Sequence, residues 1–326
     1  MHSNRLFIAI AGALVALGSL AWAGGTNEPR PAGNVVPASG YPLTVTDDAN
    51  GSVTLPAKPV RIASLTMFTD EVLLDLVEPS RLVAVTTFAA DPAISNVVDK
   101  AKGIPNRLAM NVEVLVALAP DLVFVANWTE ADKVKQLRDA GIQVYLTGTG
   151  LTVTDIKAKI ARVAMLVGEP AKARKLLDAM DVRLAEVARR LAKVPAEKRL
   201  TVIDYAVWGS AQGRGSSWDE IVGLAGLVNG VGNITADQWG QVPLSKEKLL
   251  EIDPDLMILP GWTYDDPKGA DNFFATTTTD ATLKGLKAIR NGRAYKMPES
   301  LKTTTSQYLA AAVEWLAKTA YPELFK

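Results

Sequence analysis

Two stretches of the chain share one pattern: Asn111-Val-Glu-Val-Leu-Val-Ala-Leu-Ala-Pro-Asp-Leu122 and Ser245-Lys-Glu-Lys-Leu-Leu-Glu-Ile-Asp-Pro-Asp-Leu256. Each begins with a residue type that caps helices, places a glutamate in the first turn and continues with apolar residues at helical spacing. A Pro-Asp pair then ends the helix, and an apolar run predicts a buried strand. This unit occurs twice, so the sequence predicts two similar α/β lobes with a cleft between them.

The rest of the chain alternates between strand-like and helix-like patterns, which predicts mainly parallel sheets flanked by helices. Alternating residues on both sides of Asn50-Gly51 predict a β-hairpin. The pattern from Pro170 to about Val194 predicts one long amphipathic helix, closed by Pro195. We expect an N-terminal lobe at 41–168, a connecting backbone helix at 169–196 and a C-terminal lobe at 197–326.

The first forty residues have a different character. Arg5 precedes an apolar segment that ends in Ala21-Trp22-Ala23, the small-x-small pattern of a secretory cleavage site. We expect a signal peptide at 1–23 and a flexible linker at 24–40, with an uncleaved membrane anchor as the alternative. No cysteine follows the apolar run, so we expect a periplasmic protein without a lipid anchor.

Composition excludes several kinds of chemistry. The chain has no cysteine, and its only histidine, His2, lies in the expected signal peptide. Disulfides, thiolate metal sites, serine triads and histidine-based zinc sites are therefore excluded from the mature protein. Lys and Arg together number 35, and Asp and Glu together also number 35. The composition therefore indicates no broad basic surface for nucleic acid.

Longer segments carry a family resemblance. The hairpin segment from Tyr41 to Pro59 runs into Arg61-Ile-Ala-Ser-Leu65, and Gly215-Ser-Ser-Trp-Asp-Glu-Ile-Val222 follows in the second half. Together with the two repeated units, these segments resemble periplasmic substrate-binding proteins for ferric siderophores, cobalamin and haem. The likeness covers nearly the whole mature chain. It implies two lobes joined by one backbone helix, a ligand held in the cleft, and delivery to a membrane permease driven by an ATPase.

The resemblance also gives the repeated acids a role. In relatives, one glutamate on each lobe faces arginines of the permease, and by motif position these are Glu113 and Glu247. An acid in the first turn of a helix is also stabilised by the helix dipole, by about 0.3–1 kcal/mol, without any partner. We expect docking through both acids, and a monomeric binding protein that is not an enzyme and has no resident metal or cofactor.

Ligands of open α/β sheets bind beyond the carboxyl ends of the strands. Aromatic side chains in those loops also pack between sheet and helix, and we expect about half of them to do so. Trp128 and Trp239 stand near positions where cobalamin binders of the resembled family carry tryptophans. The expected ligand-binding residues are Thr66, Met67, Phe68, Phe88, Arg107, Trp128, Tyr205, Trp208, Trp239, Trp262 and Tyr264.

Charge and residue types indicate the kind of ligand. Arg107 lies six residues before Glu113, where ferric-hydroxamate binders of the family place an arginine against the chelate. Arg214 is a second candidate, in a loop that also delivers Ser216 or Ser217 as a helix cap. Without His or Cys, haem needs a Tyr or Met ligand, and bare zinc or manganese is disfavoured. We expect a chelated metal: a ferric siderophore first, with cobalamin (a corrinoid) or haem as the alternative.

The remaining sequence features are interpreted as surface, and two other classes of protein are kept as alternatives. Gly213-Arg-Gly215 begins like a phosphate-binding loop but lacks its Lys-Ser/Thr. We interpret Thr276–Thr279 as a polar loop, and Asp265-Asp266 with Asp271 as surface acids whose spacing is not that of a calcium loop. A carbohydrate-active enzyme with paired carboxylates, or a sensor module, is the remaining alternative.

Overall fold

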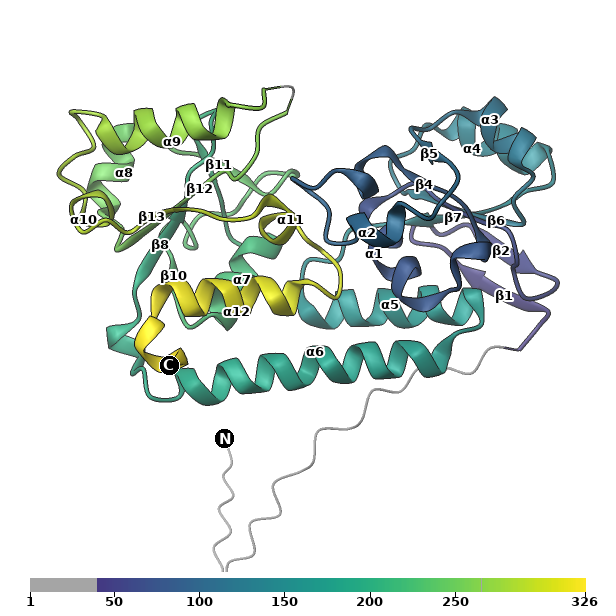
Figure 1. The fold of residues 1–326 in the computed structure, drawn as a ribbon, viewed down its shortest axis with the longest axis horizontal. Helices are drawn as coiled ribbons and strands as arrows, with labels where there is room; N and C mark the ends of the chain where they lie inside the picture. The colour runs from purple at the N-terminus through teal and green to yellow at the C-terminus, as the bar shows by residue number, and fades with distance from the viewer. Residues whose placement is uncertain (1–39, 265) are drawn as a thin grey trace, which may run out of the picture. The chain divides into compact units, whose positions relative to one another are not determined.

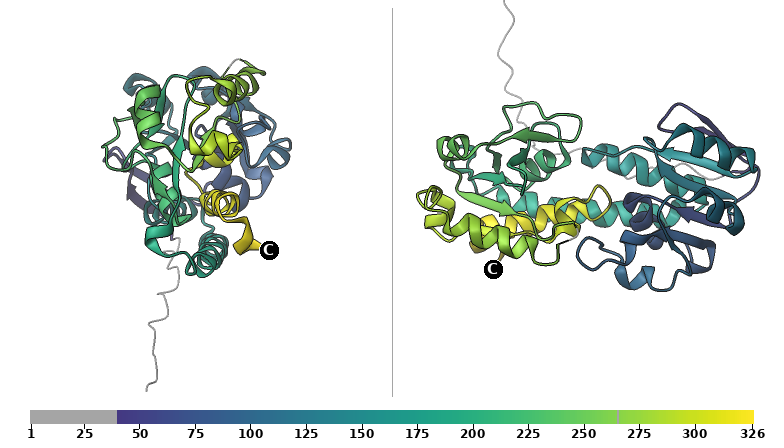
Figure 2. Two further views of the ribbon diagram at one scale, coloured as in Figure 1. Left: turned by 90° about the vertical axis from the view of Figure 1, so that its left-hand side faces the viewer. Right: turned by 90° about the horizontal axis from the view of Figure 1, so that it is seen from above.

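The computed structural model describes residues 40–264 and 266–326 (Figure 1). The predicted signal peptide, and the predicted linker up to residue 39, lie outside the described residues. No helix in the described ranges is long and apolar enough to cross a membrane. Two lobes, each built on a parallel sheet, lie along one long helix, α6 (Pro170–Leu191), as Figures 1 and 2 show.

The N-terminal lobe opens with the hairpin that Asn50-Gly51 predicts. Asn50 has a φ of 65°, the left-handed conformation that such a turn requires. Next to the hairpin is a five-stranded parallel sheet in the order β5-β4-β3-β6-β7. The strands are β1 (Leu43–Thr46), β2 (Ser52–Leu55), β3 (Ile62–Ser64), β4 (Leu82–Thr86), β5 (Arg107–Leu108), β6 (Leu122–Ala126) and β7 (Gln143–Thr147).

Helices cover both faces of this sheet, so its central strands are apolar throughout. Every residue of β4 and β6 is buried, as a parallel sheet between helix layers requires. The helices are α1 (Met67–Leu76), α2 (Val98–Ala101), α3 (Val112–Leu118), α4 (Ala131–Asp139) and α5 (Val153–Val167), with 3₁₀ turns η1 (Pro79–Arg81) and η2 (Thr87–Ala90).

The C-terminal lobe repeats this plan with four parallel strands, in the order β10-β8-β12-β13, and an antiparallel pair of β9 and β11. Its strands are β8 (Thr201–Asp204), β9 (Ser210–Gln212), β10 (Val228–Asn229), β11 (Gln241–Pro243), β12 (Leu256–Leu259) and β13 (Ala294–Lys296). Its helices are α7 (Ser217–Leu224), α8 (Lys246–Ile252), α9 (Gly269–Thr279), α10 (Lys287–Arg290), α11 (Glu299–Lys302) and α12 (Leu309–Ala320), with η3 (Ala196–Lys198) and η4 (Pro322–Phe325).

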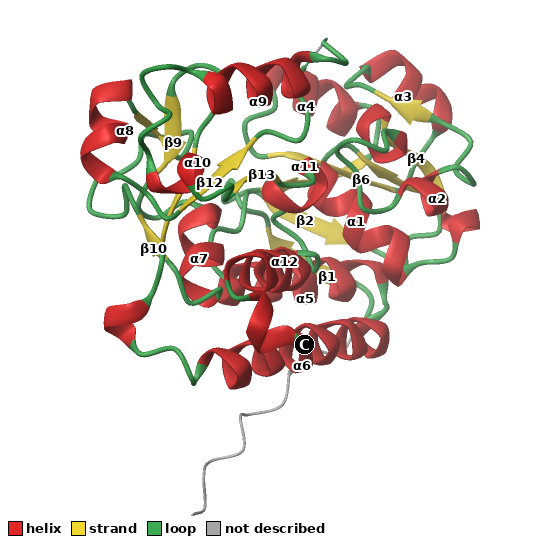
Figure 3. Ribbon diagram, turned by 60° about the vertical axis from the view of Figure 1, so that its left-hand side comes forward, coloured by secondary structure: helices red, strands yellow, loops and turns green. Residues whose placement is uncertain are grey.

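One hydrophobic cluster connects the two lobes. Helix α6 buries one side, including Leu177, Met180 and Val187, against a cluster that contains residues of α1, α5, α7 and α12. In Figure 3 these helices form a layer along the sheets. Burial of this shared apolar surface stabilises the arrangement of the lobes as well as each lobe. The predicted long amphipathic helix is therefore the connecting element of the fold.

The repeated sequence units form the same local structure in both lobes. The Asn111 side chain accepts a hydrogen bond from the Val114 N–H at 3.0 Å, and Ser245 Oγ accepts one from the Lys248 N–H at 3.2 Å. Both helices end at a residue other than glycine in the left-handed conformation, with φ values of 45° and 44°. The sequence pattern thus specifies both ends of each helix.

The aspartate of each Pro-Asp pair fixes the start of a neighbouring strand. The Asp121 carboxylate accepts the N–H groups of Val60 at 2.7 Å and Arg61 at 3.0 Å, immediately before β3. The Asp255 carboxylate accepts the N–H of Thr201 at 2.9 Å, at the start of β8. Since β6 pairs with β3 and β12 pairs with β8, each aspartate supports the register of its sheet.

One loop prediction was wrong. Thr276 to Thr279 form the last turn of α9, not a surface loop. The hydroxyls of Thr276, Thr278 and Thr279 each donate to the carbonyl four residues earlier at 2.8 Å, and Thr277 is buried. Such bonds let threonine remain in a helix despite its low helix propensity. The packing beneath α9 stabilises the helical conformation of this segment.

Candidate ligand-binding cleft

The carboxyl ends of the N-lobe strands open into a cavity of about 690 Å³, which we call the main chamber. Thr66 follows β3, Phe88 lies after β4, and Trp128 follows β6, so the parallel topology brings them together. The C-terminal lobe contributes Tyr264 and Thr305. The lining residues are Leu65, Thr66, Met67, Phe68, Thr86, Thr87, Phe88, Leu108, Ala109, Met110, Ala126, Trp128, Thr129, Thr147, Gly148, Thr149, Tyr264 and Thr305.

No charged side chain occurs among these described lining residues. The wall consists of aromatic, methionine and aliphatic side chains, with threonine hydroxyls spread between them. Such a surface offers apolar contact area together with neutral hydrogen-bond donors and acceptors. It suits a bulky ligand that carries polar but uncharged groups.

The threonines at the chamber floor are fixed by hydrogen bonds. Thr66 Oγ1 caps α1 by accepting from the Thr69 N–H at 3.1 Å. Thr86 Oγ1 donates to the buried carboxylate of Asp70 at 2.5 Å. Burial raises the pKa of Asp70 to about 7, although hydrogen bonds from Ser64 and Thr86 partly offset this. The floor is therefore preorganised before any ligand arrives.

A side chamber of about 350 Å³ adjoins the main one and shares Met67, Phe68, Phe88, Tyr264 and Thr305 with it. Trp262 belongs to this side chamber and packs edge-on against Tyr264, with ring centroids 6.0 Å apart and an interplanar angle of 82°. Edge-to-face packing of this kind is a favourable geometry that orients both rings.

A buried glutamate at the side chamber connects the lobes. Glu71 accepts from Asn96 Nδ2 at 2.7 Å within its own lobe, and from the hydroxyls of Thr304 at 3.3 Å and Ser306 in the other lobe. Burial raises the pKa of Glu71, and these hydrogen bonds work against that rise. The network holds the wall of the cleft at the junction of the lobes.

Glu299 is the second acid of the side chamber. Burial raises its pKa, while the Lys302 ammonium lowers it. Lys302 is itself buried and forms an ion pair with Asp204 at 3.0 Å. Within the described ranges, no group of three or more His, Cys, Asp or Glu residues is placed to hold a metal ion.

A third cavity, of about 400 Å³, lies between the lobes, and we call it the tryptophan chamber. Trp128 and Thr149 line both this chamber and the main one. Trp239 lines it from the loop before β11. Its full lining is Trp128, Thr149, Leu151, Gln212, Arg214, Gly215, Ser216, Ser217, Ala236, Asp237, Gln238, Trp239 and Gly240.

Eight of the eleven predicted ligand-binding residues line these cavities. They are Thr66, Met67, Phe68, Phe88, Trp128, Trp239, Trp262 and Tyr264. Seven of them follow parallel strands, β3, β4, β6 or β12, which is where the strand-end argument places them, and Trp239 lies in the loop before β11.

Three predicted residues lie elsewhere. Tyr205 is 7% exposed and packs on Phe273 of α9 at a centroid distance of 5.8 Å, so it belongs to the core of its lobe. Trp208 is exposed but lines none of the cavities described above. Arg107 also lines none, and its Nη1 donates to the carbonyls of Ala101 at 3.4 Å and Ile104 at 3.3 Å.

The two acids of the repeat are exposed. Glu113 is in the first turn of α3 and Glu247 is in the first turn of α8. Hydrogen bonds from its own backbone and from Ser245 lower the pKa of Glu247. Figure 1 shows α3 and α8 on the side of the lobes away from α6. Both carboxylates are thus available to a partner.

Some lining residues give no sequence signal. Thr305 reaches the main chamber from a segment more than 200 residues after Thr66 in the chain. Met110 lies just before α3 and resembles any apolar residue beside a helix start. Only the folded chain brings them to the strand ends.

Comparison with known proteins identifies the class. The chain belongs to the periplasmic binding protein family, whose model matches residues 62–301. YvrC of Bacillus subtilis, an uncharacterised substrate-binding lipoprotein of an ABC transporter, is 26% identical over 88% of this chain and 88% of its own. A cobalamin-binding protein of Halobacterium salinarum is 26% identical over 79% of this chain and 67% of its own.

A solved structure agrees in fold. Molybdate-bound MolA of Haemophilus influenzae has a TM-score of 0.70 and 23% identity, and the match covers 87% of this chain and 92% of that one. The resemblance in sequence is therefore confirmed: this protein is the substrate-binding component of an ABC transporter. Proteins of this class work with a membrane permease and an ATPase.

Proposed function

We propose that the protein captures a bulky metal chelate of low charge, with a corrinoid as the best match, and delivers it to a membrane permease. The main observation in support of this proposal is the main chamber of about 690 Å³, which has aromatic and threonine side chains and no charged side chain in its described lining. The flat apolar faces of a corrinoid suit aromatic walls, and its amide arms suit threonine hydroxyls.

A ferric siderophore was the first expectation from sequence, and it depended on Arg107. Since Arg107 lines none of the cavities, an anionic siderophore would enter the main chamber without a cation to compensate its charge. A neutral ferric trihydroxamate avoids that cost and stays an alternative ligand. The relative named a cobalamin-binding protein, which matches in two strains of Halobacterium salinarum, also supports the corrinoid.

The test is a panel of four probes added to the purified protein: cyanocobalamin, a neutral ferric trihydroxamate, haem and molybdate. We expect cyanocobalamin to remain with the protein through gel filtration and to raise its unfolding free energy, by about 2.7 kcal/mol at a hundred times its Kd. The absorbance spectrum identifies which probe is retained. Retention of another probe without cyanocobalamin would overturn the corrinoid assignment.

Haem needs its own control, because Tyr264, Met67 and Met110 line the main chamber and Tyr or Met can serve as an axial ligand. If haem binds, Tyr264→Phe separates coordination from simple apolar insertion. A shift of the Soret band in that variant would indicate that the tyrosine is a ligand and would favour haem.

We also propose that the protein is a binder and not an enzyme, with no metal or cofactor of its own. Support comes from relatives that are binding proteins and from a mature chain without His or Cys. Assays with glycoside substrates test the enzyme alternative, since paired carboxylates need neither residue type. Turnover at enzymatic rates would contradict the proposal.

The secreted form is a further proposal. The Ala21-Trp22-Ala23 pattern supports a periplasmic chain that begins at Gly24 and carries no lipid. The intact mass of protein purified from its own cells measures both points, and light scattering measures the expected monomer. A mass that includes residues 1–23 or a diacylglycerol group would overturn this proposal.

A further inference from the structure

The tryptophan chamber differs from the main chamber in charge. Two charged residues, Arg214 and Asp237, are among its lining residues. Asp237 Oδ1 accepts the N–H groups of Trp239 at 2.8 Å and Gln241 at 2.9 Å within its own turn. These donors partly satisfy the carboxylate, which therefore serves the shape of the loop. Arg214 is the only cationic side chain of the described lining.

The backbone around Arg214 is fixed on both sides. Its N–H donates to the Ile234 carbonyl at 2.9 Å, and the residue forms an isolated parallel bridge with Thr235. A side chain at position 213 would place its Cβ 2.4 Å from Val242, so only glycine fits there. Gly215 has a φ of +80°, which directs the chain into α7. The glycine pair noted in the sequence thus positions this arginine.

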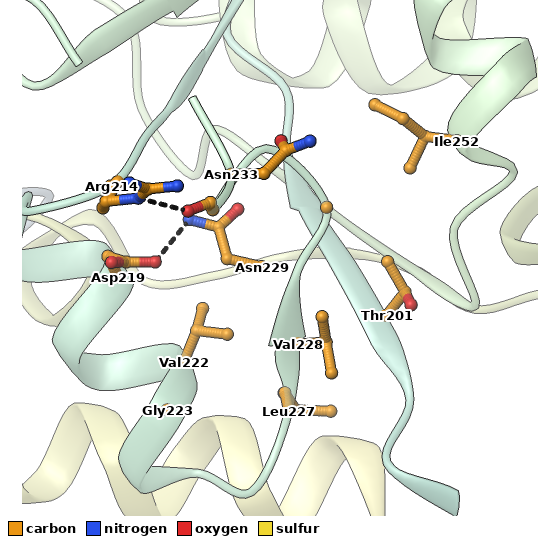
Figure 4. A pocket seen from close by; sticks show the side chains of 12 residues that line it. Thr201, Arg214, Asp219, Val222, Gly223, Leu227, Val228, Asn229, Asn233 and Ile252 are labelled. Carbon is orange, nitrogen blue, oxygen red and sulfur yellow. Dashed lines mark hydrogen bonds between the residues drawn. The ribbon is translucent and has the colours of Figure 1, made fainter. Parts of the chain in front are cut away.

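The Arg214 guanidinium has N–H donors that are not used within the described residues. Nε donates to the Gly232 carbonyl at 2.8 Å, and no carboxylate of the described ranges lies within ion-pair distance of Arg214. The neighbouring Asp219 is occupied, because its Oδ1 accepts from Asn229 Nδ2 at 2.9 Å (Figure 4). Its Oδ2 accepts from the Gly215 N–H at 3.2 Å. The terminal nitrogens of Arg214 can therefore serve a ligand.

Arg214 also borders a hollow of about 740 Å³, lined by Asp219, Asn229 and Ile252 among others. Figure 4 shows its guanidinium on the side of this hollow, where Nε is bonded to the Gly232 carbonyl. That hollow lies within the C-terminal lobe alone, whereas the tryptophan chamber has walls from both lobes and shares Trp128 with the main chamber. Arg214 lines both hollows and its side chain is exposed, so a ligand that extends from the main chamber past Trp128 enters a chamber that this arginine borders.

We infer that the tryptophan chamber holds an anionic arm of the ligand, a phosphodiester or a carboxylate, through the Arg214 guanidinium. This inference rests on the proposed function, in which the uncharged body of the chelate fills the main chamber. The planar guanidinium presents paired donors to two oxygens of one anionic group. A complete corrinoid has such a group, the phosphodiester of its nucleotide arm.

The test compares cyanocobalamin with dicyanocobinamide, which lacks the nucleotide arm, by calorimetric titration. The wild-type protein is expected to bind cyanocobalamin about tenfold or more tightly than dicyanocobinamide, as one charge-assisted hydrogen-bonded pair provides. Arg214→Gln is expected to remove this preference and to leave dicyanocobinamide affinity unchanged, which also shows that the variant is folded. Arg214→Lys keeps the charge and is expected to retain part of the preference.

Arg107→Gln is the matched control, because it removes the same charge from a residue outside the cavities, and it is expected to keep the full preference. Added salt should reduce the preference in the wild type. Equal binding of the two corrinoids by the wild type, or an undiminished preference in Arg214→Gln, overturns the inference alone. Failure of both corrinoids to bind overturns the proposed function, and the inference with it.

Discussion

Trp128 and Trp239 line one chamber from opposite lobes, and their exposed fractions are 70% and 73%. Most tryptophans of folded proteins bury more of their surface, and large exposed aromatic side chains commonly belong to binding sites. Because neither indole contributes to the core clusters, their substitution should affect binding more than folding.

Replacing either tryptophan with alanine is expected to weaken ligand binding by about tenfold or more, since each ring loses the apolar contact it makes with the ligand. The melting temperature of the free protein should change little. Titration of cyanocobalamin against Trp128→Ala and Trp239→Ala measures the effect. Trp208→Ala is the matched control, because Trp208 is 72% exposed and lines none of the cavities.

An equal loss in the Trp208 variant would show that the effect is general and not local to the cleft. Unchanged affinity in both chamber variants would mean that the ligand does not reach the tryptophan chamber. The main chamber alone would then be the binding site.

Arg107 provides a second prediction. Its guanidinium contacts the carbonyls of Ala101 and Ile104 and not the cleft, so Arg107→Gln is expected to leave the affinity for cyanocobalamin and for a ferric trihydroxamate unchanged. The stability cost should stay within about 0.5 kcal/mol, as for most surface substitutions. A tenfold loss of hydroxamate affinity in this variant would place Arg107 in the binding site and restore the siderophore as the first candidate.

Asp70 predicts a pH dependence of stability. Burial raises its folded pKa from 3.8 to about 7, so the folded state binds this proton more tightly than the unfolded state. Protonated Asp70 therefore stabilises the folded state fully below about pH 4. This stabilisation is lost as the pH rises to about 7, and the free energy of unfolding falls by at most about 4 kcal/mol. Asp70→Asn stays neutral and can still accept from the Thr86 N–H, so its stability should not show this loss.

Urea unfolding at several pH values between 4 and 8 measures the difference between wild type and Asp70→Asn. The exposed pair of Asp139 and Lys135 supplies the control, because Asp139→Asn should leave the wild-type pH dependence intact. If Asp70→Asn and wild type lost the same stability over this range, the carboxyl would be ionised in the folded protein throughout.

Local signals predicted much of the fold. Caps, first-turn acids and Pro-Asp pairs recur at fixed offsets, and the structure forms helix and strand at both copies. Asn50-Gly51 predicted the hairpin because its turn needs positive φ. Each of these signals lies within a few consecutive residues. The tertiary contacts of the fold agree with them and do not override them.

Two of the incorrect predictions concern residues whose structure depends on contacts with segments that are distant in the sequence. Thr276–Thr279 stay helical because α9 packs on its sheet and the hydroxyls bond within the helix. Tyr205 follows a strand, like the cleft residues, but Phe273 of α9 covers it. Arg107 is a different case, because its partners are local: Nη1 donates to the carbonyls three and six residues earlier, and its position before Glu113 in the sequence did not indicate these bonds.

The acids of the repeat give the last prediction. Glu113 and Glu247 are exposed in matching first turns of α3 and α8, on the side away from α6 (Figure 1). If they meet arginines of the permease, Glu113→Ala and Glu247→Ala should each impair uptake and leave ligand affinity in solution unchanged. Charge pairs at the rim of an interface act largely on the association rate, so the double variant should dock most slowly relative to wild type at low salt.

Glu186→Ala is the control for loss of one negative charge, because Glu186 lies on α6 and is bonded to Arg189 and Arg190. It should dock and transport as the wild type does. Reversing one acid of the repeat to lysine should impair docking more than alanine, since repulsion is added to the lost attraction. If the double alanine variant transported normally but melted at a lower temperature, the two acids would act through the helix dipole, and the docking role would be wrong.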